Sequence, residues 1–239
     1  MSATAIKSVL TLAFPGHCRV CRARTHGPGL CRRCYRHLPW NRSACPGCAD
    51  AVDCTGRYCE RCREQGPPPG LTAVVCPWLY EPPLDRFITA LKFEAALGVG
   101  RLLGQLLARQ VKFHLLRSDR CPDALIATPL HRSRLRQRGY NQSMEIARPV
   151  ASATGIPLIH GNLLRLRPTQ AQSGLSSSAR ADNVGSAFHA RLPARVAHVA
   201  VIDDVATTLA TARAMAAALH AAGCPRVDLW AVCRTSTPG

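Results

Sequence analysis

Eight cysteines in the first third of the chain have the spacing of metal ligands. They form four Cys-x-x-Cys pairs, separated by nine, ten and ten residues. Each pair makes a tight turn that directs two thiolates toward one tetrahedral Zn²⁺, so four pairs provide two complete four-thiolate sites. The ligands are Cys18, Cys21, Cys31, Cys34, Cys45, Cys48, Cys59 and Cys62.

The spacing leaves two ways of sharing these ligands between two metals. Sequential use of the pairs, as in two short zinc ribbons in series, is the arrangement we favour. A cross-brace would combine alternate pairs instead. Neither arrangement leaves an open coordination position, so both zinc ions are expected to be structural. A disulfide framework is the alternative to metal, but it needs an oxidising compartment, and the sequence shows no export signal.

A second group of residues has the types needed to bind a phosphorylated sugar. The segment VAVIDDVATTLATA (199–212) is an apolar strand, two adjacent acids (Asp203 and Asp204) and a threonine-rich turn that enters a helix. Hydroxyls and free backbone N–H groups at a helix N-terminus suit a phosphate, and carboxylates accept hydrogen bonds from ribose hydroxyls. The alternative is a capping cluster, in which these side chains only satisfy the unpaired N–H groups of the helix.

Strands and helices alternate along the rest of the chain and position this segment. We expect extended structure at 71–80, 124–128, 156–159, 196–202 and 226–233, and helices at 84–96, 98–117 and 208–222. This alternation predicts an α/β fold, a parallel sheet flanked by helices with functional loops at the carboxyl ends of the strands.

The segments between these elements are polar. An arginine-rich loop is expected after residue 131, followed by a helix that begins near Asn141 and is kinked at Pro149. Residues 161–190 are rich in Gln, Ser and Arg and are expected to be mostly loop.

A Pro- and Gly-rich run over 67–70 indicates a domain boundary. We expect a small zinc-binding domain over 1–66, which includes a short N-terminal amphipathic helix, and a second domain over 71–239. Because the first part has few aliphatic residues, metal would replace its core, and chelation should unfold residues 14–66 alone. The remaining cysteines are expected to be buried apolar residues or surface thiols: Cys54, Cys76, Cys121, Cys224 and Cys233.

The composition is that of a globular, strongly basic protein. The hydrophobic fraction of 47% excludes a wholly disordered chain, and 31 Lys+Arg against 14 Asp+Glu give a net charge of +17. This surplus favours affinity for phosphates, of nucleic acid or of a small molecule, although an Arg-biased genome would also produce it. No apolar run is long enough to span a bilayer, and the expected location is the cytoplasm.

The segment 199–212 looks like the motif that binds phosphoribosyl pyrophosphate (PRPP) in type I phosphoribosyltransferases. Almost the whole chain resembles the ComF family, whose members join a double zinc ribbon to a phosphoribosyltransferase-like domain and are linked to natural competence. The resemblance rests on short pieces in a fixed order. They are Phe14-Pro15, Leu91-Lys92-Phe93, Arg138 to Gln142, Arg165, Arg167, Thr169, Gln172, Leu175, Arg180, Asn183, Ala187, Phe188 and the acidic pair.

The resemblance implies a role for each part of the site. Asp203 and Asp204 would be the catalytic pair that holds the ribose hydroxyls of PRPP. The neighbouring loop would hold its 5′-phosphate, and a loop after an earlier strand would hold pyrophosphate with Mg²⁺. The PRPP-binding residues would be Val205, Thr207, Thr208, Ala210 and Thr211 in the first loop, and Thr128, Leu130 and His131 in the second. A flexible loop that closes on the site would comprise Arg138, Gly139, Tyr140, Asn141 and Gln142.

One residue departs from the family pattern. Leu209 stands where the phosphate loop of the family has Gly or another small residue, which lets the backbone approach phosphate closely.

Three functions fit these features. The first is a competence protein that binds PRPP with Mg²⁺ and single-stranded DNA, alongside a DNA-uptake helicase or other competence proteins. The second is an active phosphoribosyltransferase of nucleotide salvage, and the third is a zinc-ribbon adaptor with an inactive transferase fold. The retained acidic pair argues against the third, and the lack of a readable base-specificity pocket weakens the second. The net charge, the cysteine pairs and the resemblance favour the first.

Overall fold

The computed structural model describes residues 16–25, 29–52, 58–118, 120–167 and 187–235. The N-terminal helix expected before Phe14 and the thiol of Cys54 lie outside these ranges.

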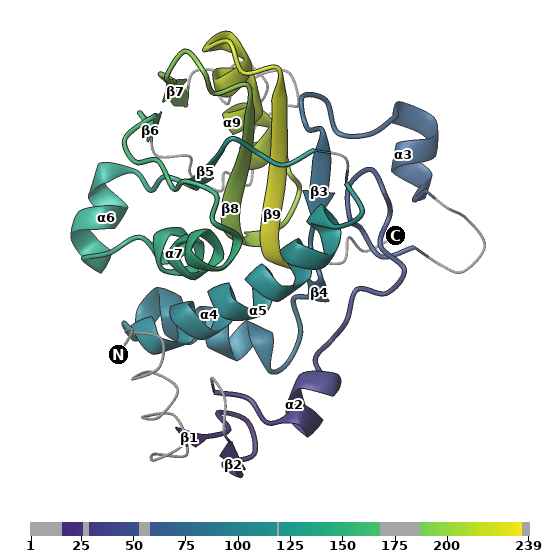
Figure 1. Cartoon of the computed structure of the whole chain (residues 1–239), viewed down its shortest axis with the longest axis vertical. Coiled ribbons are helices and arrows are strands. Elements are labelled where there is room, and N and C mark those ends of the chain that lie inside the picture. The colour runs from purple at the N-terminus through teal and green to yellow at the C-terminus, as the bar shows by residue number, and fades with distance from the viewer. Residues whose placement is uncertain (1–15, 26–28, 53–57, 119, 168–186, 236–239) are drawn as a thin grey trace, which may run out of the picture.

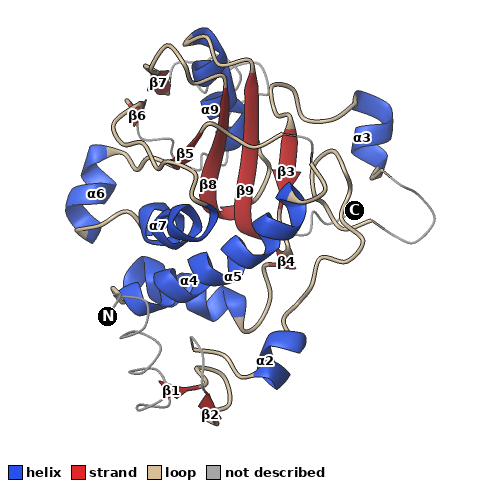
Figure 2. Cartoon of the chain, in the orientation of Figure 1, coloured by secondary structure: helices blue, strands red, loops and turns tan. Residues whose placement is uncertain are grey.

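A parallel sheet forms the centre of the molecule (Figures 1 and 2). Its strands lie in the order β3 (Ala73–Val75), β9 (Arg226–Arg234), β8 (His198–Ala206) and β5 (Ala124–Ala127), and β4 (Trp78–Leu79) pairs with the end of β9. Every one of these pairings is parallel. The expected α/β fold with a parallel sheet is therefore confirmed.

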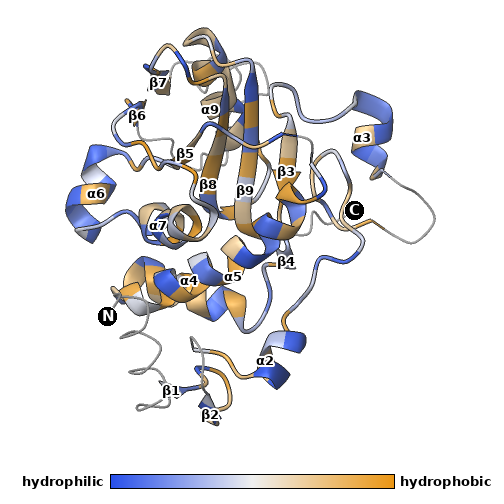
Figure 3. Ribbon diagram, viewed as in Figure 1, coloured by the Kyte–Doolittle hydropathy of each residue, from blue (hydrophilic) through white to orange (hydrophobic). Residues whose placement is uncertain are grey.

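Helices cover both faces of this sheet. On one face lie α4 (Leu84–Phe93), α5 (Leu97–Leu115) and α7 (Gln142–Thr154), and their apolar side chains form one core cluster with Ile202 and Trp230. On the other face lies α9 (Ala210–Ala221), which forms a second core cluster with Val201 and Leu229. The alternation of these strand residues between the two clusters is the period-two pattern of a strand buried on both sides. Figure 3 shows apolar residues along the strands and on the helix surfaces that face them.

Strand β8 is longer than the sequence predicts, and this changes where the acidic pair lies. The strand was expected to end at Ile202, but it continues to Ala206 because β9 pairs with it up to Ala206 and Arg234. Asp203 and Asp204 therefore lie inside the strand rather than after it. Helix α9 correspondingly begins at Ala210, not at residue 208.

The arginine-rich segment after residue 131 is a helix where the sequence predicts a loop. Helix α6 (Arg132–Arg138) begins at His131, whose ring nitrogen accepts the backbone N–H of Ser133, and ends at Gly139 with a φ of +79°. Local capping at both ends stabilises this turn of helix despite its charge. Helix α7 begins after Asn141, as expected, and continues past Pro149 to Thr154.

The remaining elements are short. The cysteine-rich part contains the hairpin β1 (Gly16–His17) with β2 (Arg24–Thr25), and the helices α2 (Arg32–Arg36) and α3 (Glu60–Gln65). Strands β6 (Leu163–Arg165) and β7 (Phe188–Ala190) pair at the two ends of the region expected to be loop. The strand expected at 156–159 makes only a single bridge, between Leu158 and Leu125. Of the four described cysteines outside the ligand set, Cys76, Cys224 and Cys233 are buried and Cys121 is exposed.

Within the described ranges, none of the helices combines the length and the apolar character needed to cross a membrane.

Candidate functional site

Both members of the acidic pair of β8 already have partners, and Asp204 is buried whereas Asp203 is half-buried. Asp204 forms an ion pair with Lys92 of α4, with 2.7 Å between Nζ and Oδ2, and only 6% of the Asp204 side chain is exposed. A buried carboxylate needs such a counter-charge, because transfer from water disfavours its charged form. Lys92 is therefore part of this site, and it lies in the Leu91-Lys92-Phe93 piece to which the sequence assigned no role.

Asp203 has a different environment from its neighbour. Its Oδ1 accepts a hydrogen bond from the hydroxyl of Ser143, at 3.1 Å, and another from the backbone N–H of Asp204, at 2.9 Å. Burial, followed by the nearby charge of Asp204, raises the pKa of Asp203 to about 7. A buried carboxyl with a raised pKa beside a second carboxyl is typical of functional sites.

The threonine-rich loop follows directly on β8. Thr207, Thr208 and Ala210 are exposed and Thr211 is half-buried. The hydroxyl of Thr208 accepts the N–H of Ala210 at 3.4 Å, next to the first turn of α9. The loop thus presents hydroxyl and N–H groups at the N-terminal end of a helix of 12 residues, where a phosphate is favoured.

Leu209 adopts a backbone conformation that explains the glycine of the family pattern. Its φ of 62° lies in the left-handed region, which costs an L-residue with a side chain roughly 1–2 kcal/mol. Its side chain is 4% exposed and packs in the same core cluster as α9. The leucine side chain therefore packs into the core.

The loop after β5 lies beside the acidic pair. The backbone N–H of Thr128 donates to the carbonyl of Ile202 at 2.9 Å, and the Thr128 hydroxyl is buried without a hydrogen-bond partner among the described residues. Leu130 and His131 follow, both half-buried. The carboxyl ends of β5 and β8 therefore bring Thr128, the acidic pair and the threonine loop to one edge of the sheet.

The segment from Arg138 to Gln142 is attached to this edge by several hydrogen bonds. The amide Nδ2 of Asn141 donates to the carbonyl of Thr128 at 2.9 Å, and its Oδ1 accepts the N–H of Ser143 at 3.0 Å. The hydroxyl of Tyr140 donates to the carbonyl of Leu91. The closing movement that the resemblance implies for these residues stays a prediction.

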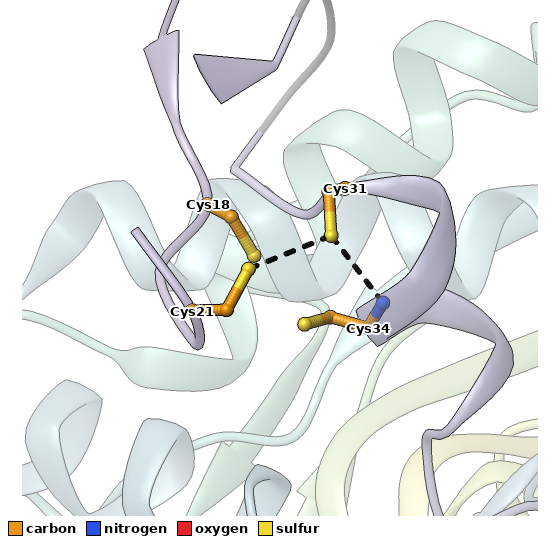
Figure 4. A group of neighbouring side chains, drawn as sticks. All are labelled: Cys18, Cys21, Cys31 and Cys34. Atoms are coloured by element: carbon orange, nitrogen blue, oxygen red, sulfur yellow. Dashed lines mark hydrogen bonds between the residues drawn. The ribbon is translucent and has the colours of Figure 1, made fainter. Parts of the chain in front are cut away.

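The cysteines form two clusters in sequential order. Cys18, Cys21, Cys31 and Cys34 make the first cluster, shown in Figure 4, and Cys45, Cys48, Cys59 and Cys62 make the second. In each, all four Sγ atoms lie within 4.8 Å of one another. This grouping confirms the sequential arrangement and excludes the cross-brace.

The geometry and chemistry of both clusters fit Zn²⁺. A tetrahedral ion with Zn–S bonds of about 2.3 Å separates its sulfurs by about 3.8 Å. The Sγ atoms of Cys21 and Cys31 lie 3.7 Å apart in the first cluster, and those of Cys48 and Cys59 lie 3.5 Å apart in the second. Burial and the neighbouring thiols raise the pKa of Cys34 to about 12, and a bound cation would favour its thiolate form. Each cluster can hold one zinc ion.

A fully buried arginine connects the second cluster to the threonine loop. Arg234, at the end of β9, is 0% exposed. Its Nε donates to the carbonyl of Cys48 at 3.2 Å, and its Nη1 donates to the carbonyls of Ala206, at 3.1 Å, and Thr207. Its Nη2 lies 3.4 Å from Oδ2 of Asp50. One guanidinium group therefore connects a residue of the second cysteine cluster to the threonine loop.

Comparison with known proteins places this arrangement in a family. The DNA utilization protein YhgH of Salmonella typhimurium is 32% identical over 228 residues, which cover 94% of this chain and 99% of the relative. Competence protein F of Haemophilus influenzae is 28% identical over 232 residues, which cover 92% of this chain and 98% of the relative. The chain belongs to the ComF family.

Other comparisons of the ComF-family chain give weaker likenesses. Among solved structures it is similar to Trypanosoma cruzi hypoxanthine phosphoribosyl transferase, with 18% identity and a TM-score of 0.31, covering 55% of this chain and 62% of that one. No protein-family model matches the chain.

The site of this ComF-family chain contains three residues whose role the sequence did not reveal. Lys92, Ser143 and Arg234 each contact the acidic pair or its loop from an element distant in the sequence. The sequence does show one sign of Arg234, because a charged residue at the end of an apolar run needs a partner when it is buried. It does not show which partners these are, since they lie up to 186 residues away.

Proposed function

We propose that this ComF-family chain binds PRPP together with Mg²⁺, binds single-stranded DNA, and acts in the uptake or use of DNA. The observation that carries the first part is the shared edge of the sheet, where an acidic pair, a threonine loop at a helix N-terminus and Thr128 lie together. The names of the relatives, DNA utilization protein and competence protein F, support the cellular role.

Different parts of the site would bind different groups of the PRPP molecule. The ribose hydroxyls donate to the carboxylates of Asp203 and Asp204, and the 5′-phosphate accepts hydrogen bonds from the loop that contains Thr207, Thr208 and Thr211. Lys92 holds the Asp204 carboxylate in place, and the ion pair compensates for its burial. The loop from Thr128 to His131 holds the pyrophosphate.

Magnesium fits this site because oxygen atoms are the ligands it prefers, and pyrophosphate and carboxylates supply them. When bound, the ion neutralises the charge of the pyrophosphate. The chain itself positions the sugar, and the buried setting of the acidic pair strengthens each polar interaction with it.

The DNA-binding part of the proposal rests on charge. Arg132, Arg134 and Arg136 are exposed on α6, the helix that directly follows the loop from Thr128 to His131. Arginines along a surface helix neutralise phosphates without reading sequence, so binding should tolerate any sequence and weaken as salt is added.

Isothermal titration calorimetry with PRPP and Mg²⁺, then with an oligo-dT strand on the same preparation, tests both parts. We expect PRPP binding to be abolished in a variant that combines Asp203→Asn with Asp204→Asn. The matched control is Glu94→Gln, which removes an exposed acid next to the end of α4 and should bind as the wild type does. Unchanged PRPP affinity in the double variant would remove the assigned site.

The salt dependence tests the DNA part. Replacing Arg132, Arg134 and Arg136 by Ala should reduce the slope of log affinity against log salt by up to about three contacts. If the wild-type chain shows no binding of oligo-dT at low salt, the proposed contact with DNA is wrong.

A further inference from the structure

A solvent-exposed phenylalanine lies at the edge of the candidate site. Phe93 is the last residue of α4 and directly follows Lys92, which pairs with Asp204 at 2.7 Å. It is 75% exposed, more than the other exposed aromatic residues, Phe113 at 54% and Tyr58 at 38%, in the described part of the chain. The ring is open to solvent and lies beside charged groups. Packing in the core therefore does not explain why this residue is aromatic.

An arginine is fixed over this ring. The guanidinium carbon of Arg138 lies 5.5 Å from the ring centroid of Phe93, within the range of a cation–π contact. Nη1 of Arg138 also donates to Oε1 of Gln142 at 2.6 Å, and Gln142 is buried at the start of α7. The ring therefore has a cation beside it, and most of its surface remains available.

We infer that Phe93 is a stacking platform for an unpaired nucleobase, and that Arg138 with the exposed arginines of α6 holds the attached phosphates. An aromatic ring beside a basic track is the arrangement by which proteins bind single strands without sequence preference. This inference rests on the proposed function, because the nucleobase that stacks on Phe93 would lie at the edge of the proposed PRPP site. The unpaired base can belong to a DNA strand or to a free nucleoside.

Fluorescence anisotropy of labelled oligo-dT at low salt tests the platform. Phe93→Ala should bind about tenfold or more weakly, and Phe93→Tyr should bind as the wild type does. The matched control is Phe113→Ala, which removes an exposed ring from α5 and should leave the affinity unchanged. An oligonucleotide of the same length with abasic sugars should bind equally to wild type and Phe93→Ala, because it retains phosphates and lacks bases.

The outcomes separate this inference from the proposed function. Absence of oligo-dT binding by the wild type overturns both. Binding by the wild type with equal affinity for Phe93→Ala overturns only the stacking platform. Competition by free thymidine assigns the base to a small ligand, and displacement by unlabelled oligo-dT alone assigns it to DNA. Either result supports the stacking platform, provided that Phe93→Ala weakens the binding that is measured.

A different observation carries a second inference, at the other side of the threonine loop. The guanidinium of Arg234 contacts the carbonyl of Cys48 and the carbonyls of Ala206 and Thr207. Asp50 completes its surroundings, and Arg61 of α3 lies 3.7 Å from the same carboxylate oxygen of Asp50. A ligand residue of the second cluster and the first residue of the phosphate loop therefore share one fixed group.

We propose that Arg234 is a positioning residue, through which the second cysteine cluster sets the shape of the phosphate loop. This also rests on the proposed function, since the loop is the one assigned to the 5′-phosphate. A planar guanidinium has five N–H donors in a fixed arrangement and can bridge these carbonyls, whereas a single ammonium group cannot. Loss of metal from the second cluster would release Cys48 and, with it, the loop.

Calorimetric titration with PRPP and Mg²⁺ tests this link in two ways. Arg234→Lys, which keeps the charge beside Asp50, should bind PRPP about tenfold more weakly and oligo-dT as the wild type does. A split of this kind is not expected from general loss of structure, which would weaken both. In Cys21→Ser, which damages only the first cluster, PRPP affinity should stay at the wild-type value until a chelator removes the zinc of the second cluster.

Two results would overturn the link. One is wild-type PRPP affinity in Arg234→Lys. The other is a loss of PRPP affinity in Cys21→Ser, before any chelator is added, as large as the loss in Arg234→Lys. Failure of the wild type to bind PRPP would instead overturn the proposed function.

Discussion

The two cysteine clusters have the same ligands and nearly the same spacing, yet they are built into the molecule differently. In the second cluster Cys45, Cys48 and Cys62 are buried in the core cluster that also contains Met215 of α9 and Val201 of β8. In the first, Cys21 is exposed and the thiols belong to neither core cluster. Spacing therefore predicts the metal, but the surroundings decide what the metal supports.

The first cluster is attached to the body through side chains next to its ligands. Tyr35 accepts a hydrogen bond from Gln110 of α5 at 2.9 Å, and its ring lies 5.0 Å from the guanidinium carbon of Arg109. Leu30 and Trp40 pack against the same core cluster as α5. This region docks on the outside of a helix, whereas the second cluster fills part of the interior.

The largest expected difference follows from removing one ligand from each cluster. Cys48→Ser should lower the melting temperature of the whole chain by about 10 °C or more, because loss of a structural metal also opens a core cluster. Cys21→Ser should shift the main transition by no more than a few degrees. Calorimetry measures the transitions, and native mass spectrometry should show two zinc ions in the wild type and one in Cys21→Ser.

This expectation departs from the sequence-based one, in which chelation unfolds residues 14–66 alone. Equal effects of the two substitutions would break the comparison, and a wild-type chain with fewer than two zinc ions would show that one cluster is not a zinc site.

The next effect concerns arginines near the two clusters. Arg234→Met should destabilise the chain by about 3–5 kcal/mol, because it leaves the buried carbonyls of Cys48, Ala206 and Thr207 without their donor and removes the closer of the two arginines beside Asp50. Arg19→Met, next to a ligand of the first cluster and exposed, should change the free energy of unfolding by less than about 0.5 kcal/mol. Urea denaturation of both variants measures this difference, and similar values would contradict the contrast.

The acidic pair makes the stability of the folded chain depend on pH. Burial and the charge of Asp204 raise the pKa of Asp203 to about 7, so the folded chain retains a proton that the unfolded chain loses near pH 4. Between about pH 4 and 7 the folded state binds more protons, and its stability falls as pH rises. Asp203→Asn should remove this fall and should be more stable than the wild type at pH 8. Urea denaturation across this range checks it, and a parallel pH profile in both proteins would contradict the assignment.

The smallest effect comes from Leu209, which belongs to the core cluster of the second site. Leu209→Gly relieves a left-handed φ of 62°, worth about 1 kcal/mol, but removes a buried side chain, worth about 2–5 kcal/mol. Packing decides the balance, so the variant should be destabilised by about 2 kcal/mol. Leu209→Ala keeps the strain and should be about 1 kcal/mol worse.

Calorimetry adds the functional readout for this position. PRPP affinity should hold or rise in Leu209→Gly, and a large loss would show that the leucine is an adapted part of the loop.

The sequence could predict what is local and not what is distant. The cysteine spacing predicted the clusters, and the alternation of strands and helices predicted the parallel sheet. Asp203 and Asp204 were placed after a strand because nothing within their own segment shows that β9 pairs with β8 as far as Ala206. The partner of Asp204, Lys92, comes from another element, and the same is true of Arg234 and Cys48, which are 186 residues apart.

The position of β9 between β3 and β8 has a consequence for how the protein is made. Strand β3 has β9 as its neighbour, and β9 comes about 150 residues later in the sequence. At roughly 5–20 residues per second, the ribosome takes about 8 to 30 seconds to synthesise that interval. Until β9 has been synthesised, β3 has no neighbouring strand in the sheet, and β8 has no partner along the edge that β9 later occupies. Both core clusters include residues of β9, so neither can be completed until almost the whole chain has been synthesised.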